Sequence, residues 1–230
     1  MKHLILILFS FCTILVHAQT DQLNEVQKLV QTFKEKQDLD ALDKAKELIG
    51  ELVTKENNAQ SSLIQMTRAQ VLTLALENLE PESPIDECND IIDAYSSALS
   101  NDSNMSHRPK ILLDLYDSKI NMMNKGNAIY EESDYDMAHQ FYEKSLELNE
   151  LEMAYPRVMP RDTSLLFTSG VFANLAGKSD EAIQIFEELV TMDYSREDMY
   201  NYLEKLYTEK GQEQKAEKIV ALKEKRFPSK

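Results

Sequence analysis

Small and aromatic residues recur at a fixed spacing along the C-terminal half of this chain, and this repeat restricts the fold more than any other feature. The three sets are Gly126, Ala138 and Tyr142, then Gly170, Ala182 and Phe186, then Tyr207, Ala216 and Pro228. Successive sets are 34 residues apart, except that the first spacing also contains an insert of 10 residues near 153–162. A period of about 34 residues is typical of a helix-turn-helix repeat, which must stack because one hairpin cannot bury its apolar face alone.

The small residues of these sets have physical reasons to be small. Gly126 and Gly170 stand where the two helices of a hairpin approach each other closely. Gly177 and Gly211 permit the left-handed turn between two helices. Alanines occupy the places where the second helix would cross the first, at Ala138, Ala182 and Ala216.

Residues 119–230 resemble the tetratricopeptide repeat (TPR) family on these positions. That repeat carries a small residue, a large residue, an alanine and an aromatic residue in this order, and often a proline near its end. The copies depart from the pattern at Glu150, Ala173, Glu204 and Val220. The resemblance implies an all-α fold, a right-handed α-solenoid of about five antiparallel helix pairs.

Apolar residues recur at helical spacing in the N-terminal half as well. The predicted helices cover residues 20–36, 39–55, 59–79 and 85–99. Pro109 suits the first turn of a fifth helix, where its missing N–H costs nothing. We therefore expect degenerate TPR-like hairpins over 19–105 and an array of three TPRs over 106–230. The alternative is an N-terminal helical bundle joined to three repeats.

The first 18 residues have the composition of an export signal. Lys2 gives a positive start, an apolar run extends from Leu4 to Val16, and Ala18 is the small residue that signal peptidase requires. We expect a cleaved signal peptide over 1–18 and an exported chain that is periplasmic or secreted; the alternative is an uncleaved membrane anchor. No other segment has the composition of a membrane span. The pattern resembles exported TPR proteins of Gram-negative envelopes.

The charge of the chain argues against nucleic acid as a partner. The sequence has 25 Lys and Arg against 40 Asp and Glu, a formal net charge of −15. Loss of Lys2 with the signal would leave 24 basic and 40 acidic residues, a net charge of −16. Such a surface repels phosphate backbones, so we expect no nucleic-acid binding.

Groups that could carry catalysis are scarce in the sequence. After signal cleavage it would retain His107, His139 and Cys88, without any paired motif. We expect each histidine to be a surface or packing residue and Cys88 to be a small buried hydrophobe that has no cysteine to pair with. The prediction is a chain that is not an enzyme and needs no metal or cofactor. The alternative is an enzyme that uses a carboxylate pair the sequence does not reveal.

Two D-x-D pairs could suggest a cation site. They are Asp38 with Asp40 and Asp134 with Asp136. A calcium loop would need a further acidic ligand, a glycine and a distal glutamate at set spacing, and neither pair has them. We expect these acids to cap helix N-termini instead.

The TPR resemblance also implies where a partner binds. In that family the first helix of each pair lines a concave groove, with four of its positions facing the ligand. The matching residues are Met123, Asn127, Tyr130, Phe167, Val171, Asn174, Asn201 and Lys205. Chaperone-binding members of the family hold the C-terminal carboxylate of the chaperone with a clamp of Lys and Asn residues. Met123 stands where that clamp has a lysine, so we do not expect the clamp in this chain. We expect a non-catalytic protein-protein interaction scaffold of the cell envelope with a protein or peptide partner; the alternative is a periplasmic assembly factor or chaperone for envelope complexes.

Overall fold

The structure is a computed structural model that describes residues 20–55, 58–79, 83–154 and 161–228. The expected signal peptide over 1–18 lies outside the described residues, as does most of the expected insert near 153–162. Within the described part of the chain, no helix is long and apolar enough to cross a membrane.

All regular elements among the described residues are helices and none is a strand, which confirms the all-α prediction. Residues 20–36 are helical and precede nine further α-helices. These are α2 (Leu39–Thr54), α3 (Ser62–Asn78), α4 (Pro84–Asn101), α5 (Arg108–Glu131), α6 (Tyr135–Met153), α7 (Thr163–Leu175), α8 (Ser179–Thr191), α9 (Glu197–Glu209) and α10 (Glu213–Arg226). This order along the chain gives the five helix pairs expected from the repeat.

Acidic residues start several of these helices, as the sequence predicted. The side chain of Asp38 accepts a hydrogen bond from the backbone N–H of Ala41, and that of Asp134 accepts one from Met137. Each bond satisfies a backbone donor that has no partner inside its helix. The predicted capping role is therefore confirmed for both residues.

The chain divides into two compact units, and the division lies inside α5. We call residues up to Asn121 the N-terminal unit and residues from Met122 onward the C-terminal unit. The expected boundary between 105 and 106 precedes α5 and stays a prediction. Each unit is described by itself below.

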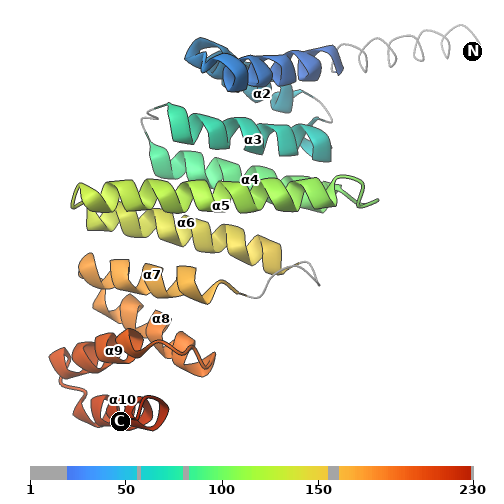
Figure 1. Ribbon diagram of the computed structural model, residues 1–230. Coiled ribbons are helices and arrows are strands. Elements are labelled where there is room, and N and C mark those ends of the chain that lie inside the picture. The colour runs from blue at the N-terminus through green and yellow to red at the C-terminus, as the bar shows by residue number, and fades with distance from the viewer. Residues whose placement is uncertain (1–19, 56–57, 80–82, 155–160, 229–230) are drawn as a thin grey trace, which may run out of the picture. The chain divides into compact units, whose positions relative to one another are not determined.

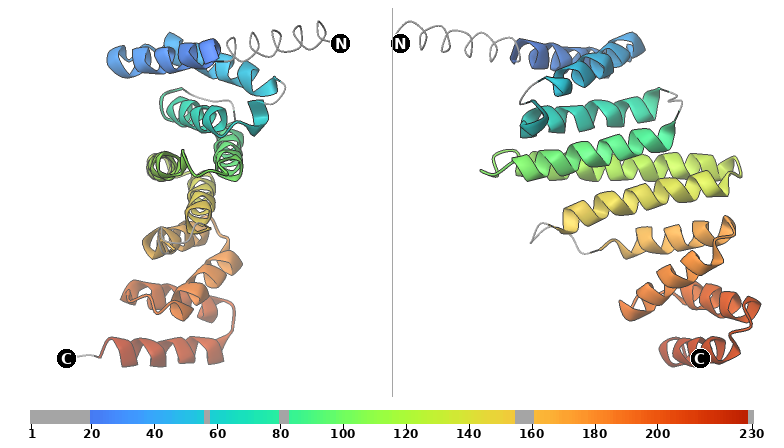
Figure 2. Two further views of the ribbon diagram at one scale, coloured as in Figure 1. Left: turned by 90° about the vertical axis from the view of Figure 1, so that its right-hand side faces the viewer. Right: turned by 180° about the vertical axis from the view of Figure 1, so that it is seen from behind.

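In the N-terminal unit, α2 packs on α3 and α3 packs on α4 (Figure 2). Val26, Ile49 and Val71 belong to one apolar cluster that joins residues 20–36, α2 and α3. Farther along, α4 buries Cys88, as the sequence predicted, together with Tyr95. The core of this unit therefore follows the apolar stripe of each helix.

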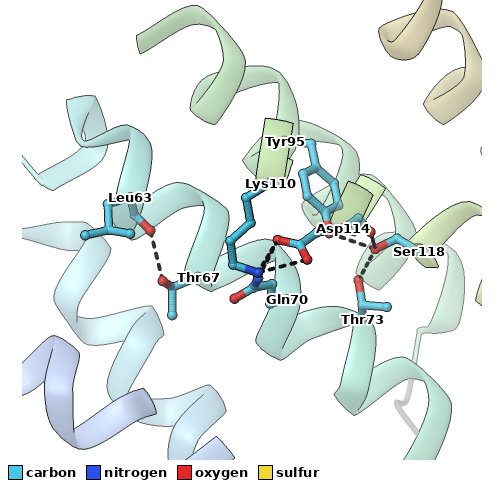
Figure 3. A network of polar contacts seen from close by, with 8 residues as sticks. All are labelled: Leu63, Thr67, Gln70, Thr73, Tyr95, Lys110, Asp114 and Ser118. Carbon is cyan, nitrogen blue, oxygen red and sulfur yellow. Dashed lines mark hydrogen bonds and ion pairs between the residues drawn. The ribbon is translucent and has the colours of Figure 1, made fainter. Parts of the chain in front are cut away.

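A buried chain of hydroxyl groups links three helices of the N-terminal unit (Figure 3). The Ser118 hydroxyl on α5 lies 2.8 Å from the hydroxyl of Tyr95 on α4 and 2.7 Å from that of Thr73 on α3. It also donates to the backbone carbonyl of Asp114, at 2.9 Å. Because Tyr95 is fully buried, these contacts satisfy a polar group that water cannot reach.

In the C-terminal unit, consecutive helices from α6 to α10 pack on one another (Figure 1). The small residues of the repeat lie at the close approaches. A Cβ atom on Gly126 would lie 3.0 Å from Cδ2 of Tyr142, and one on Gly170 would lie 2.7 Å from Cε1 of Phe186. Ala138 and Ala182 are fully buried. The predicted reasons for these small residues are confirmed.

The turns between paired helices of the C-terminal unit use the left-handed region of the backbone. Gly177 has a φ of 77° and Gly211 has a φ of 66°. In the first copy the equivalent position is Ser133, with a φ of 67°. The same turn geometry therefore occurs three times, once without glycine.

Candidate functional site

The eight expected groove residues lie on α5, α7 and α9, the first helices of the last three pairs. Their exposure divides them into three groups. Asn127, Tyr130, Asn201 and Lys205 are exposed; Met123, Val171 and Asn174 are half-buried; Phe167 is buried. The exposed residues therefore lie on α5 and α9, whereas the candidates on α7 are half-buried or buried. We call the four exposed residues the first-helix strip.

The α5 end of the strip is tied to the helix pair that carries it. Met123 and Val171 both pack against the cluster of Ala138, Tyr142 and Phe172. The Tyr142 hydroxyl donates a hydrogen bond to Oδ1 of Asn127 at 2.7 Å. Asn127 is therefore held by its own hairpin, and its amide nitrogen is the part of its side chain that this bond leaves available.

Tyr130 joins the first of these pairs to the next through its ring. The ring centroids of Tyr130 and Phe172 are 5.0 Å apart with planes inclined by 19°, so the rings stack. The Tyr135 ring lies 5.6 Å away on the other side of the turn. Tyr130 nevertheless leaves 40% of its surface exposed. It is both a packing residue and an aromatic surface that a partner could contact.

Phe167 lies beneath the surface. It is only 5% exposed, and the guanidinium carbon of Arg196 lies 4.2 Å from its ring centroid. The rings of Tyr194 and Tyr202 lie 6.0 and 6.3 Å from it. In this structure Phe167 supports the neighbouring hairpin, and Arg196 covers it. Its role as a direct contact for a partner stays a prediction.

Asn201 and Lys205 lie together at the other end of the strip. With Asp198 and Tyr202 they line a shallow hollow on α9. Lys223 donates to Oδ1 of Asn201 at 3.0 Å, and Lys205 pairs with Glu209 at 3.7 Å. The hollow therefore offers an amide, a cation, a carboxylate and an aromatic ring within one helix face.

A second group of side chains, which the sequence did not single out, joins α6 to α8. His139 is fully buried, and its Nε2 lies 3.0 Å from Oε1 of Glu181 and 3.7 Å from Oε2 of Glu143. One ligand atom from each residue lies within 4.8 Å of the other two. We call these three residues the His-Glu-Glu cluster. Beside them, Lys178 pairs with Asp136 at 2.9 Å.

Close packing sets the protonation of the His-Glu-Glu cluster. Burial and a hydrogen bond with Glu181 raise the pKa of Glu143 to about 7. Burial acts in the same direction on Glu181, but the hydrogen bond with Glu143 and the proximity of His139 lower the pKa of Glu181 overall. Burial lowers the pKa of His139 although Glu181 opposes this shift, so burial favours the neutral imidazole.

Glu143 and Glu181 are also the close carboxylate pair that the enzyme alternative required. Their side chains leave 41% and 36% of their surface exposed, respectively. They lie at the surface where two hairpins meet, not in an enclosed polar pocket. A substrate bound there would not be shielded from water, which catalysis by a pair of this kind generally needs. The two carboxylates are therefore close to each other but not enclosed.

The sequence could have revealed two of the three residues of this cluster as neighbours. His139 and Glu143 are four residues apart on one helix, which places both side chains on the same face. Glu181 comes 42 residues after His139, so only the packing of α6 against the next hairpin brings it close. Periodicity alone cannot show such a contact.

No family model and no curated protein matches this sequence. Solved structures to which the chain is similar include two that are described as TPR or TPR-like proteins. PilF of Pseudomonas aeruginosa has 14% identity and a TM-score of 0.37, with 93% of this chain and 80% of that chain covered. A kinesin light chain-like protein with TPR-like repeats from Podosopora anserina has 13% identity and a TM-score of 0.36, with coverage of 90% and 99%.

A tetratricopeptide repeat protein from Parabacteroides merdae has 15% identity and a TM-score of 0.35, with 88% of this chain and 80% of that chain covered. These values describe a loose match. The fold class therefore rests on the helices of this chain itself, which follow one another in pairs without a strand among the described residues.

Proposed function

We propose that this chain is a non-catalytic scaffold of the cell envelope that binds a partner polypeptide along the first-helix strip. The observation that carries the proposal is the set of exposed polar and aromatic side chains on the first helices α5 and α9: Asn127, Tyr130, Asn201 and Lys205. The first helix between them in the chain, α7, adds the half-buried Val171 and Asn174. Apolar side chains of the same helices are buried behind them.

The chemistry of the strip suits an extended peptide. A side-chain amide both donates and accepts hydrogen bonds, so Asn127 and Asn201 can pair with a peptide backbone. Tyr130 offers aromatic area that already has a fixed position through its stacking on Phe172. Fixed aromatic side chains lose little entropy on binding, and they often dominate the binding energy of an interface.

The envelope location belongs to this proposal and is supported by the first residues of the sequence. The positive start at Lys2, the apolar run from Leu4 and the small residue Ala18 are the features of an export signal. Fractionation of cells that express the full chain, combined with N-terminal sequencing of the product, tests it. A mature start after Ala18 supports export; an intact cytoplasmic product contradicts it.

Site-specific photocrosslinking in the native host tests the binding surface. A photoreactive residue at Lys205 is expected to capture a partner polypeptide, because this side chain lies exposed in the α9 hollow. The same probe at Gln184, which is exposed on the second helix α8, is the matched control. Capture of the same species with equal yield from both positions contradicts the assignment of the surface.

Binding measurements with the captured and purified partner then test the surface and distinguish a scaffold from an assembly factor or chaperone. Lys205→Glu is expected to weaken its binding at least tenfold, whereas Gln184→Glu leaves it unchanged. Asn127 is less suitable for this test, because its loss also removes the acceptor of the Tyr142 hydroxyl. A complex that survives purification supports a scaffold. Rapid exchange with unfolded envelope proteins supports the assembly factor or chaperone.

A further inference from the structure

We propose that His139, Glu143 and Glu181 form a binding site for a divalent transition-metal ion of the zinc type, which ties α6 to the first turn of α8. The proposal does not depend on the partner surface described above. His139 and Glu143 come from one face of α6, and Glu181 comes from the next hairpin. Three ligand atoms from two helices thus converge on one point.

The spacing of these atoms matches a tetrahedral ion. Zinc binds imidazole nitrogen and carboxylate oxygen at about 2.0–2.2 Å, which places two ligand atoms about 3.4 Å apart. Nε2 of His139 lies 3.0 Å from one carboxylate oxygen and 3.7 Å from the other. The two distances lie on either side of the tetrahedral value. All three ligand atoms lie within 4.8 Å of one another, so rotations of the half-exposed glutamate side chains would bring them to the tetrahedral spacing.

The charges of the surrounding residues also favour a dication. Lys178 and Asp136 neutralise each other at 2.9 Å. The two glutamates of the cluster, Glu143 and Glu181, bring two negative charges when both are ionised. A divalent ion would balance this charge, and it would replace the proton that otherwise relieves the repulsion between Glu143 and Glu181.

The donor set indicates which class of ion fits. One imidazole and two carboxylates suit zinc and its neighbours in the transition series, whereas Mg²⁺ and Ca²⁺ prefer sites built from oxygen alone. Nδ1 of His139 has no hydrogen-bond partner among the described residues. Such partners typically raise metal affinity by 10–100-fold, so we expect micromolar binding and not the tighter binding of a fully supported site.

Three protein ligands leave a fourth position for water or for a group from a bound partner. Because Glu143 and Glu181 are 41% and 36% exposed, that position opens to solvent. The ion would connect two neighbouring helix pairs of the C-terminal unit. The ion is therefore expected to stabilise the contact between these two repeats.

Calorimetric titration of the purified chain with zinc chloride tests the site. We expect one Zn²⁺ per chain with a micromolar Kd. Glu143→Gln and Glu181→Gln keep the size of each side chain but remove its charge, and each is expected to weaken binding at least tenfold. The matched control is Glu147→Gln, which removes the same charge from a similarly half-exposed position of α6 one turn further on. It is expected to bind zinc like the unchanged protein.

Nitrogen NMR of the imidazole gives a second readout that does not depend on mutation. Zinc is expected to shift the Nε2 resonance of His139 and to leave that of His107 in place. The proposal is overturned if no stoichiometric zinc binding occurs, if Glu147→Gln weakens binding as much as Glu181→Gln, if the His139 resonance does not move, or if Mg²⁺ or Ca²⁺ binds with equal affinity.

Discussion

A Cβ atom on Gly170 would lie 2.7 Å from Cε1 of Phe186, closer than two carbon atoms can pack. It would also lie 2.9 Å from Cγ2 of Ile185. Phe186 is fully buried and has little room to move. We expect Gly170→Ala to lower the free energy of unfolding by about 1–2 kcal/mol, because overpacking costs more than alanine gains as a helix former. Thermal and urea unfolding followed by circular dichroism measure this change.

Gly50 is the matched control for that substitution. It also lies within a helix, α2, but apart from its chain neighbours and the backbone of its own helix nothing lies within 4 Å of a Cβ placed on it. Gly50→Ala is expected to raise the stability by about 0.5–1 kcal/mol, because alanine loses less backbone entropy on folding. If both substitutions stabilise the protein, the close approach of α7 and α8 at Gly170 is not as described.

Ser133 takes a left-handed backbone conformation where the other two copies have glycine. This conformation costs a residue with a side chain about 1–2 kcal/mol in steric strain, whereas glycine costs about 0.5–1 kcal/mol in backbone entropy on folding. We therefore expect Ser133→Gly to stabilise the C-terminal unit by about 0.5–1 kcal/mol in urea unfolding. Gly177→Ser makes the reverse change in the next copy and should destabilise it by a similar amount. Equal signs for the two variants would refute the account.

The helices of this fold were predictable because they are determined by residues close together in the sequence. Apolar spacing and N-caps are set by residues a few positions apart, and the predicted helix over residues 20–36 agrees with the described one. Prediction missed the start of α3 by three residues. Asn58–Gln60 forms a short 3-10 helix, and Ser61 then caps α3, so the α-helix begins at Ser62. Cap chemistry decided this boundary where apolar periodicity could not.

The candidate sites were less predictable because they depend on contacts between residues that are far apart in the sequence. Phe167 is buried because Arg196 and Tyr202, about thirty residues later, pack over it. Glu181 meets His139 only through the stacking of two hairpins. Repeat position identifies which helix carries a residue, but the next hairpin determines whether that residue reaches solvent.

The hydroxyl of Ser118 connects those of Tyr95 and Thr73 in the N-terminal unit. Ser118→Ala is expected to cost about 1–3 kcal/mol, because it leaves the fully buried Tyr95 hydroxyl without this partner. The cost should fall when Tyr95→Phe removes that hydroxyl as well. A double-mutant cycle in urea measures the coupling between the two changes. Additive effects would show that the hydroxyl contact contributes nothing.

Glu187 accepts hydrogen bonds from the Tyr207 hydroxyl and from Lys215, and both bonds lower the pKa of Glu187. A carboxyl whose pKa is lowered by folding stabilises the protein above its unfolded pKa. This contribution is lost as the pH falls through the folded pKa. Tyr207→Phe removes the larger cause. It should therefore raise the pKa of Glu187 toward its ordinary value and reduce stability above pH 4.5 more than below it.

Carbon NMR titration of the Glu187 carboxyl measures this change directly, and thermal unfolding between acid and neutral pH measures its effect on stability. Tyr202→Phe is the control, because Tyr202 stacks on Phe186 through its ring and not through its hydroxyl. That variant should leave the pKa of Glu187 unchanged. If Tyr207→Phe also leaves it unchanged, Lys215 alone accounts for the lowered pKa, and the tyrosine bond is not a source of acid-sensitive stability.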